Sequence, residues 1–121
     1  MPEMILKYEF TFEAAHQLPQ VPPDHKCRRL HGHSFRVLVR VKGLVDETMG
    51  WVCDFADIRS AVSSLIETHL DHRFLNEVPG LENPTSENLA KWLWQRIKLV
   101  LPQLYEIEIG ETCRTSCIFR G

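Results

Sequence analysis

Two long stretches in which apolar and polar residues alternate constrain the fold of this chain more than any other feature. In the first, residues 4–14, the even positions are apolar or aromatic, while positions 7, 9, 11 and 13 are polar. In the second, residues 31–42, the apolar residues from position 35 onward take the odd positions, with Leu38 as the exception. A period of two predicts strands with one buried face. The expected buried positions are Met4, Leu6, Tyr8, Phe10, Phe12, Ala14, Phe35, Val37, Val39 and Val41.

Two helices are predicted after these strands. Asp54 can cap the first, and Thr85 or Ser86 can cap the second, which Pro102 ends. Apolar residues recur at helical spacing in both segments. The residues expected on the buried faces are Phe55, Ile58, Val62, Leu65 and Ile66 in the first helix and Leu89, Trp92, Leu93, Ile97 and Val100 in the second.

Two more strands are predicted near the end of the sequence, over residues 105–109 and 117–119. The resulting order ββααββ predicts an α+β fold, in which two helices cover one face of an antiparallel sheet. Because 121 residues with 44% hydrophobic content suffice for one core, we expect a single domain over 1–121. The uncovered face and the sheet edges would need partners.

Composition excludes several classes of protein. The net charge of −2 does not suit a general nucleic-acid or membrane-surface binder. No apolar run is long enough for a signal sequence or a membrane span, so the expected location is the cytoplasm. In that reducing compartment the cysteines are expected to be free thiols rather than disulfides. They are Cys27, Cys53, Cys113 and Cys117.

Three histidines fall on matching faces of the two long strands. His31 and His33 share the odd parity of the apolar face of the second strand, and His16 shares the even parity of the first. If the strands are antiparallel neighbours, the three imidazoles meet at one end of the sheet. Three neutral nitrogen ligands with an open fourth position are typical of a catalytic zinc site. The alternative is that two of these histidines are ordinary core or rim residues.

The long loop between these strands, residues 17–30, carries a cysteine among basic residues, and long loops in small domains are often functional. Cys27 could be a fourth metal ligand, which would make the site closed and structural. If Cys27 does not bind the metal, the positive charges of Lys26, Arg28 and Arg29 favour a reactive thiolate. Those charges fit either phosphate binding or a solvated turn.

Two acidic positions complete the set of candidates. Asp71 precedes His72, and an aspartate that fixes the tautomer of an imidazole is a recurrent acid–base device. Glu111 continues the apolar parity of the strand over residues 105–109. A carboxylate on a buried face is costly unless donors pair with it, so it suggests a ligand with N–H groups. Alternatively, the strand ends at Gly110 and Glu111 turns into solvent. The spacing of Cys113 and Cys117 would allow a second metal site, although free thiols on a terminal strand explain them more simply.

Five motifs resemble those of the 6-pyruvoyl-tetrahydropterin synthase superfamily. They are FEAAH, CRRLHGHS, LDHRFLN, NPTSEN and GETC, in that order from residue 12 to residue 113. The short Cys-x3-His-Gly-His spacing favours the branch of 6-carboxytetrahydropterin synthases, which make precursors of queuosine and other deazapurines.

The resemblance implies a role for each candidate. It implies zinc held by the histidines, proton transfer by the cysteine with an Asp–His pair, and a glutamate that anchors the pterin ring with help from the start of the second helix. The matching residues are His16, His31 and His33 for the metal; Cys27, Asp71 and His72 for catalysis; and Glu111, Thr85, Ser86 and Glu87 for substrate binding.

The resemblance also implies an assembly and a reaction. Similar proteins have the tunnelling fold, in which subunits join their sheets into a barrel with sites between subunits, and a hexamer built as a dimer of trimers is expected. The implied reaction converts 7,8-dihydroneopterin triphosphate and water to 6-carboxy-5,6,7,8-tetrahydropterin, acetaldehyde and triphosphate. Two alternatives stay open: an enzyme that stops at triphosphate elimination to give the 6-pyruvoyl product, and a non-catalytic zinc-binding module.

Overall fold

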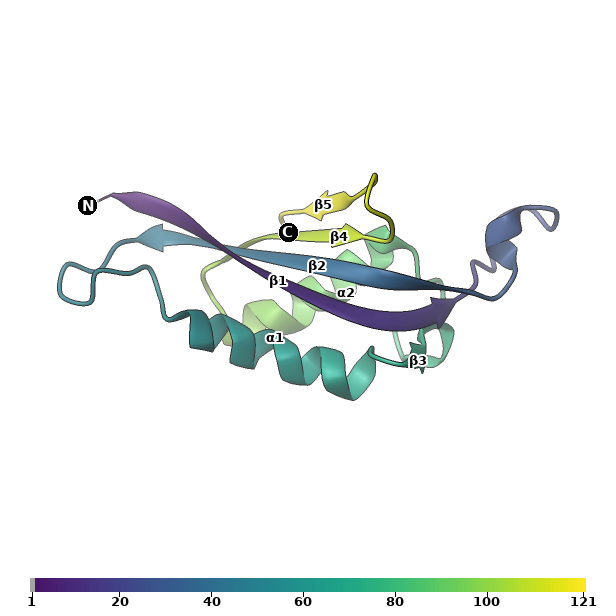
Figure 1. Ribbon diagram of the computed structural model, residues 1–121, viewed down its shortest axis with the longest axis horizontal. Coiled ribbons are helices and arrows are strands. Elements are labelled where there is room, and N and C mark those ends of the chain that lie inside the picture. The colour runs from purple at the N-terminus through teal and green to yellow at the C-terminus, as the bar shows by residue number, and fades with distance from the viewer. Residues whose placement is uncertain (1) are drawn as a thin grey trace.

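The computed structural model describes residues 2–121 and contains one sheet and two α-helices (Figure 1). The predicted ββααββ order is confirmed, and one short strand, β3, is added after the first helix. The elements are β1 (Glu3–His16), the 3₁₀ turn η1 (Lys26–Arg28), β2 (His31–Leu44), α1 (Phe55–His69), β3 (Arg73–Phe74), η2 (Leu75–Glu77), α2 (Ser86–Val100), β4 (Leu104–Gly110) and β5 (Cys117–Phe119).

The sheet is built around the long hairpin of β1 and β2. The strand order is β3-β1-β2-β4-β5, and β1 pairs with β2 along its whole length, from Glu3 opposite Leu44 to His16 opposite His31. The four predicted strands are antiparallel, as expected. The added strand β3 runs parallel to β1 and makes the sheet mixed. A two-residue strand is too short to show a period in the sequence. Within one chain the sheet is open at both edges.

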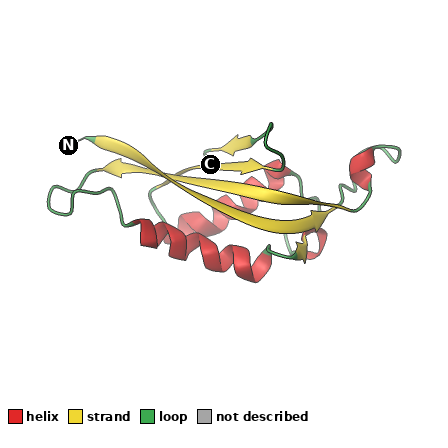
Figure 2. Ribbon diagram, in the orientation of Figure 1, coloured by secondary structure: helices red, strands yellow, loops and turns green. Residues whose placement is uncertain are grey.

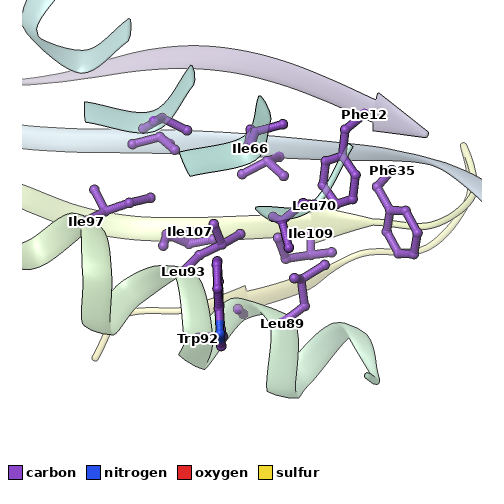
Figure 3. Packing of buried hydrophobic residues seen from close by; sticks show 14 of the residues in the cluster. Phe12, Phe35, Ile66, Leu70, Leu89, Trp92, Leu93, Ile97, Ile107 and Ile109 are labelled. Atoms are coloured by element: carbon purple, nitrogen blue, oxygen red, sulfur yellow. The ribbon is translucent and has the colours of Figure 1, made fainter. Parts of the chain in front are cut away.

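Both helices pack on the same face of the sheet, as predicted (Figure 2). The core between the two layers contains Phe12 and Phe35 from the hairpin and Ile107 and Ile109 from β4 (Figure 3). Phe12 and Phe35 stack with their ring centroids 5.0 Å apart. Burying a side chain of this size stabilises the fold by about 1.5–3 kcal/mol. The core therefore fixes the end of the hairpin that carries the histidines.

The helix starts follow the predicted capping. The Asp54 carboxylate accepts a hydrogen bond from the N–H of Ala56 at 2.9 Å, and the Thr85 hydroxyl accepts one from the N–H of Asn88 at 3.1 Å. Thr85 rather than Ser86 is therefore the cap of α2. Met4, near the start of β1, was expected in the core but is 52% exposed. Two expected core positions in the helices were wrong as well: Phe55 is 51% exposed and Val100 is 64% exposed. They are the first residue of α1 and the last residue of α2, where the helices end.

The face of the sheet away from the helices carries charged residues. Arg40 donates to Glu106 at 2.6 Å and to Glu108 at 2.8 Å, and Arg120 donates to Glu106 at 2.9 Å. The hydrogen bond from Arg40 holds the pKa of the Glu108 carboxyl below its usual value. Ion pairs within the chain thus compensate the buried Glu106. Neither α-helix in the described part of the chain combines the length and apolarity that crossing a membrane requires.

Candidate metal centre and active site

The three predicted histidines converge at one end of the β1–β2 hairpin. The sheet register places His16 directly opposite His31, and His33 opposite the small Ala14. The ring centroids lie 4.5 Å apart for His16 and His31, 5.0 Å for His16 and His33, and 4.9 Å for His31 and His33. One ligand atom from each histidine lies within 4.8 Å of the others. The prediction that these side chains meet on one face is confirmed, and they are positioned to hold a metal ion.

Backbone carbonyls fix the tautomers of two of these rings. The Nδ1 atom of His16 lies 2.8 Å from the Pro84 oxygen, and the Nδ1 atom of His31 lies 2.7 Å from the Arg29 oxygen. Because a carbonyl only accepts, each Nδ1 carries the hydrogen, and each Nε2 keeps its lone pair for a metal.

The Nε2 atoms of the cluster are also suited to binding a metal. The Nε2 atoms of His16 and His33 are buried and have no hydrogen-bond partner. Burial also lowers the pKa of His16, which favours the neutral form that coordinates metal. An unpartnered buried nitrogen is costly unless a ligand takes its lone pair. Phe35 lies beneath the cluster, with ring centroids 5.6 Å from His16 and 5.5 Å from His33.

Glu111 lies beside the cluster. β4 ends at Gly110, as in the alternative, but the Glu111 side chain turns inward as expected and is 26% exposed. One carboxylate oxygen accepts a hydrogen bond from the Ser86 hydroxyl at 2.8 Å, and the other lies 3.6 Å from His33 Nε2. A hollow of about 170 Å³ opens here. Its lining includes Ser86, Glu87 and Glu111.

Asp71 and His72 form a pair at the edge of β1. The Nδ1 atom of His72 lies 3.1 Å from Asp71 Oδ2, while Asp71 Oδ1 accepts from the Glu13 N–H at 3.0 Å. These hydrogen bonds, that from Glu13 foremost, hold the pKa of the Asp71 carboxyl below its usual value. His72 has a φ of 59°, a left-handed conformation that is uncommon for residues other than glycine and often marks a functional site.

The pair and the cluster share a second hollow. It measures about 550 Å³, and its lining includes His72 and His33. The His72 side chain is 78% exposed, and no hydrogen bond or ion pair joins the Asp–His pair to the three histidines within residues 2–121.

Cys27 lies in η1, within the loop between β1 and β2. Its N–H donates to His25 Nδ1 at 3.0 Å, and its carbonyl accepts from the Leu18 N–H at 2.8 Å. Its side chain takes no part in any hydrogen bond or ion pair of residues 2–121. Within that range the group of possible metal ligands consists of the three histidines. This group includes neither Cys27 nor the thiols of Cys113 and Cys117. A closed site with Cys27 as fourth ligand is therefore absent from the described chain.

The chain matches the family described as 6-pyruvoyl tetrahydropterin synthase over residues 5–121. It belongs to this family. A relative from Synechocystis sp., a 6-carboxy-5,6,7,8-tetrahydropterin synthase, is 45% identical over 93% of this chain and 89% of its own. A 6-pyruvoyl tetrahydrobiopterin synthase from Drosophila melanogaster is 33% identical over 99% of this chain and 81% of its own.

A solved structure supports the same conclusion. The 6-pyruvoyl tetrahydropterin synthase of Caenorhabditis elegans has a TM-score of 0.90 to this chain, at 30% identity, over 100% of this chain and 97% of that chain. The expected α+β tunnelling fold is confirmed, and the chain is an enzyme of the pterin synthase family.

Two contacts in the site of this pterin synthase family member could not be predicted from residue type. The carbonyls of Pro84 and Arg29 orient two of the histidines, and Pro84 lies next to the cap of α2. Every residue has a backbone carbonyl, so residue type carries no signal for such a role. Thr85, expected to bind substrate, is engaged as the helix cap, and Glu87 is exposed at the rim of the smaller hollow.

Proposed function

We propose that this chain is a zinc-dependent 6-carboxy-5,6,7,8-tetrahydropterin synthase, a lyase. It would convert 7,8-dihydroneopterin triphosphate and water to 6-carboxy-5,6,7,8-tetrahydropterin, acetaldehyde and triphosphate. The observation that carries the proposal is the cluster of three imidazoles, two of them with a buried and unpartnered Nε2 atom, beside the inward-turned Glu111. The Synechocystis relative at 45% identity favours the carboxy branch of the family.

The metal in this proposal is held by His16, His31 and His33. Three neutral nitrogen donors with an open fourth position are typical of catalytic zinc. When bound, zinc supplies Lewis-acid polarisation of the oxygens on the side chain of the substrate. The carbonyls of Pro84 and Arg29 keep two of the ligands in the tautomer that zinc needs.

Glu111 is the proposed anchor of the pterin ring. Its carboxylate accepts from Ser86, lies in a hollow and keeps acceptor capacity for ring N–H groups. Ser86 orients this carboxylate, while Glu87 lines the rim. Thr85 contributes indirectly in this proposal, because it caps the helix whose first residue is Ser86.

Proton transfer is assigned to Cys27 and His72. The Asp71 carboxylate accepts from Nδ1 of His72, which leaves Nε2 to take or give a proton. The chemistry requires protons to be moved on both sides of the substrate side chain while triphosphate leaves. Carbon–carbon cleavage then releases acetaldehyde and leaves the 6-carboxy group. Cys27, in the loop between His16 and His31, is the second proton carrier.

The proposed enzyme is a homo-oligomer, a hexamer formed as a dimer of trimers with active sites between subunits. The open edges of the sheet and the 78% exposure of His72 support completion of the site by a neighbour. We place this one-domain enzyme in the cytoplasm and in queuosine or related deazapurine synthesis, and four free cysteines fit a reducing compartment.

Product analysis tests the proposed function. Zinc-loaded protein is incubated with 7,8-dihydroneopterin triphosphate, and acetaldehyde, triphosphate and 6-carboxytetrahydropterin are measured beside a Cys27→Ala variant of known zinc content. We expect one acetaldehyde per triphosphate from the wild type, and none from a variant that retains zinc. Triphosphate without acetaldehyde would move the chain to the pyruvoyl branch. Loss of zinc from the variant, with no turnover by the wild type, would support a non-catalytic module.

A further inference from the structure

The loop that carries Cys27 has no hydrophobic anchor. None of residues 17–30 is buried, and η1 contributes no residue to the core. A loop of this kind would sample many conformations, because fixing each residue costs backbone entropy and no apolar burial offsets that cost. Hydrogen bonds must therefore hold the turn around Cys27.

Arg28 makes the two side-chain hydrogen bonds that close this loop. Its Nη1 donates to the carbonyl of Pro19 at 3.0 Å and to the carbonyl of Val21 at 2.8 Å. Both acceptors lie in the part of the loop that leaves β1, whereas Arg28 lies in the part that returns to β2. The donor is a guanidinium, and hydrogen bonds from charged donors are stronger than neutral ones.

Two hydrogen bonds to backbone carbonyls connect the Arg28 clamp, meaning its bonds to Pro19 and Val21, to the site. The Cys27 carbonyl accepts from Leu18 at 2.8 Å, two positions after His16. The Arg29 carbonyl accepts from Nδ1 of His31 at 2.7 Å. The residue that closes the loop therefore lies between the candidate proton carrier and the carbonyl that orients a metal ligand.

We propose that Arg28 is a positioning residue, which holds the Cys27 turn closed against the end of β1, and that it does not serve as a ligand for the triphosphate. Its guanidinium is already directed at two carbonyls of its own loop. The neighbouring Arg29 has the same charge, and its side chain makes no hydrogen bond or ion pair within residues 2–121. The catalytic part of this inference rests on the proposed function, while the clamp itself does not.

A matched pair of variants tests the clamp without reference to activity. Arg28→Met removes the donors and keeps an apolar stem, and Arg29→Met removes the same charge without removing a side-chain hydrogen bond. In zinc-loaded protein without substrate, we expect hydrogen exchange at the Leu18 and Cys27 amides to rise about tenfold or more in Arg28→Met only, because two charge-assisted bonds are lost. Alkylation of Cys27, followed by peptide mass spectrometry, should accelerate in that variant, with the exposed Cys113 as internal reference.

Turnover then tests the positioning role. We expect Arg28→Met to lower kcat about tenfold or more with little change in KM, zinc content or melting temperature, since misplacing a catalytic group affects the chemical step. Arg28→Lys, which keeps the charge but not the planar fork, should recover only part of the rate.

Three outcomes would overturn the inference. Unchanged loop exchange in Arg28→Met would eliminate the clamp. Equal rises of KM in Arg28→Met and Arg29→Met would show that Arg28 acts through its charge on the substrate. Faster exchange with unchanged kcat would show that the clamp does not position a catalytic group. If the wild type has no turnover at all, the proposed function fails, and the exchange result still decides the clamp.

Discussion

The histidine cluster and the Cys27 turn lie next to each other along the chain but are held in different ways. The histidines occupy regular positions of paired strands, and His16 is 1% exposed above the buried ring of Phe35. The Cys27 turn lies in a loop without a single buried residue and depends on hydrogen bonds. The metal ligands are thus fixed by the global fold, whereas the turn can open without unfolding the sheet.

This difference suits the two proposed tasks. A metal centre needs ligands whose geometry does not change, and a rigid sheet provides it. A proton carrier must admit a substrate and release a product, so a locally held turn is appropriate. The hydrogen bond between His31 and the Arg29 carbonyl is the point at which the two regions meet.

The largest expected effect comes from Phe35→Ala. Phe35 is fully buried and contacts two of the histidines, so the variant should lose about 3–5 kcal/mol of unfolding free energy. Urea denaturation monitored by tryptophan fluorescence measures this loss. Lys26→Ala, in the Cys27 turn, is the control and should change stability by less than about 0.5 kcal/mol. Similar losses in both variants would mean that the turn belongs to the same cooperative unit as the cluster.

The next effect is the stabilisation of the fold by zinc. If the cluster is preformed by the sheet, free zinc at about 100 times its Kd should add about 2.7 kcal/mol to the unfolding free energy of the wild type. His33→Ala should abolish this increment, and Cys27→Ala should retain it, because Cys27 lies outside the ligand cluster. Thermal melts with and without added zinc measure both. A lost increment in Cys27→Ala would contradict the separation of the two regions.

Much of the sheet and of the cluster could be predicted from the sequence because they follow from periodicity. The reversed parity of the two long strands determined which face is buried and placed His16, His31 and His33 together once the strands paired. Capping chemistry located the start of α1 at Asp54. The same rule left Thr85 and Ser86 undecided, and the structure separates them into a cap and a partner of Glu111.

What could not be predicted depends on tertiary contacts that leave no periodic signal. β3 exists because two residues after α1 meet the edge of β1. Glu111 turns inward although the strand has ended, since Ser86 from a different element is there to donate to it. The role of Arg28 depends on the path of an irregular loop back to Pro19 and Val21. In the sequence Arg28 cannot be distinguished from Arg29.

A smaller effect is expected from Thr85→Ala, which tests whether Thr85 acts as a cap or as a substrate ligand. Loss of the hydrogen bond to the Asn88 N–H should lower the unfolding free energy by about 1 kcal/mol. Thr85→Ser keeps the capping hydroxyl and should restore most of it. Chemical denaturation gives the stability, and KM for the pterin substrate gives the second readout. A raised KM in both variants at unchanged stability would assign Thr85 to the substrate instead.

The smallest effect concerns Asp71, which shares one property with each region: its carboxylate is anchored to the β1 backbone, yet its side chain is 36% exposed. Because the folded state lowers the pKa of Asp71 below its ordinary value of 3.8, its contribution to stability is fully present above that pH and is lost as the pH falls through the lower folded value. Asp71→Asn should therefore be less stable than the wild type at neutral pH and converge with it in strong acid. The measurement is the difference between the denaturation midpoints of the two proteins at each pH across the acidic range. Because both proteins share all other titrating groups, the effects of those groups cancel in this difference. Parallel curves at every pH would mean that the Glu13 and His72 contacts do not hold the pair in place, and His72 would then resemble the mobile turn rather than the sheet.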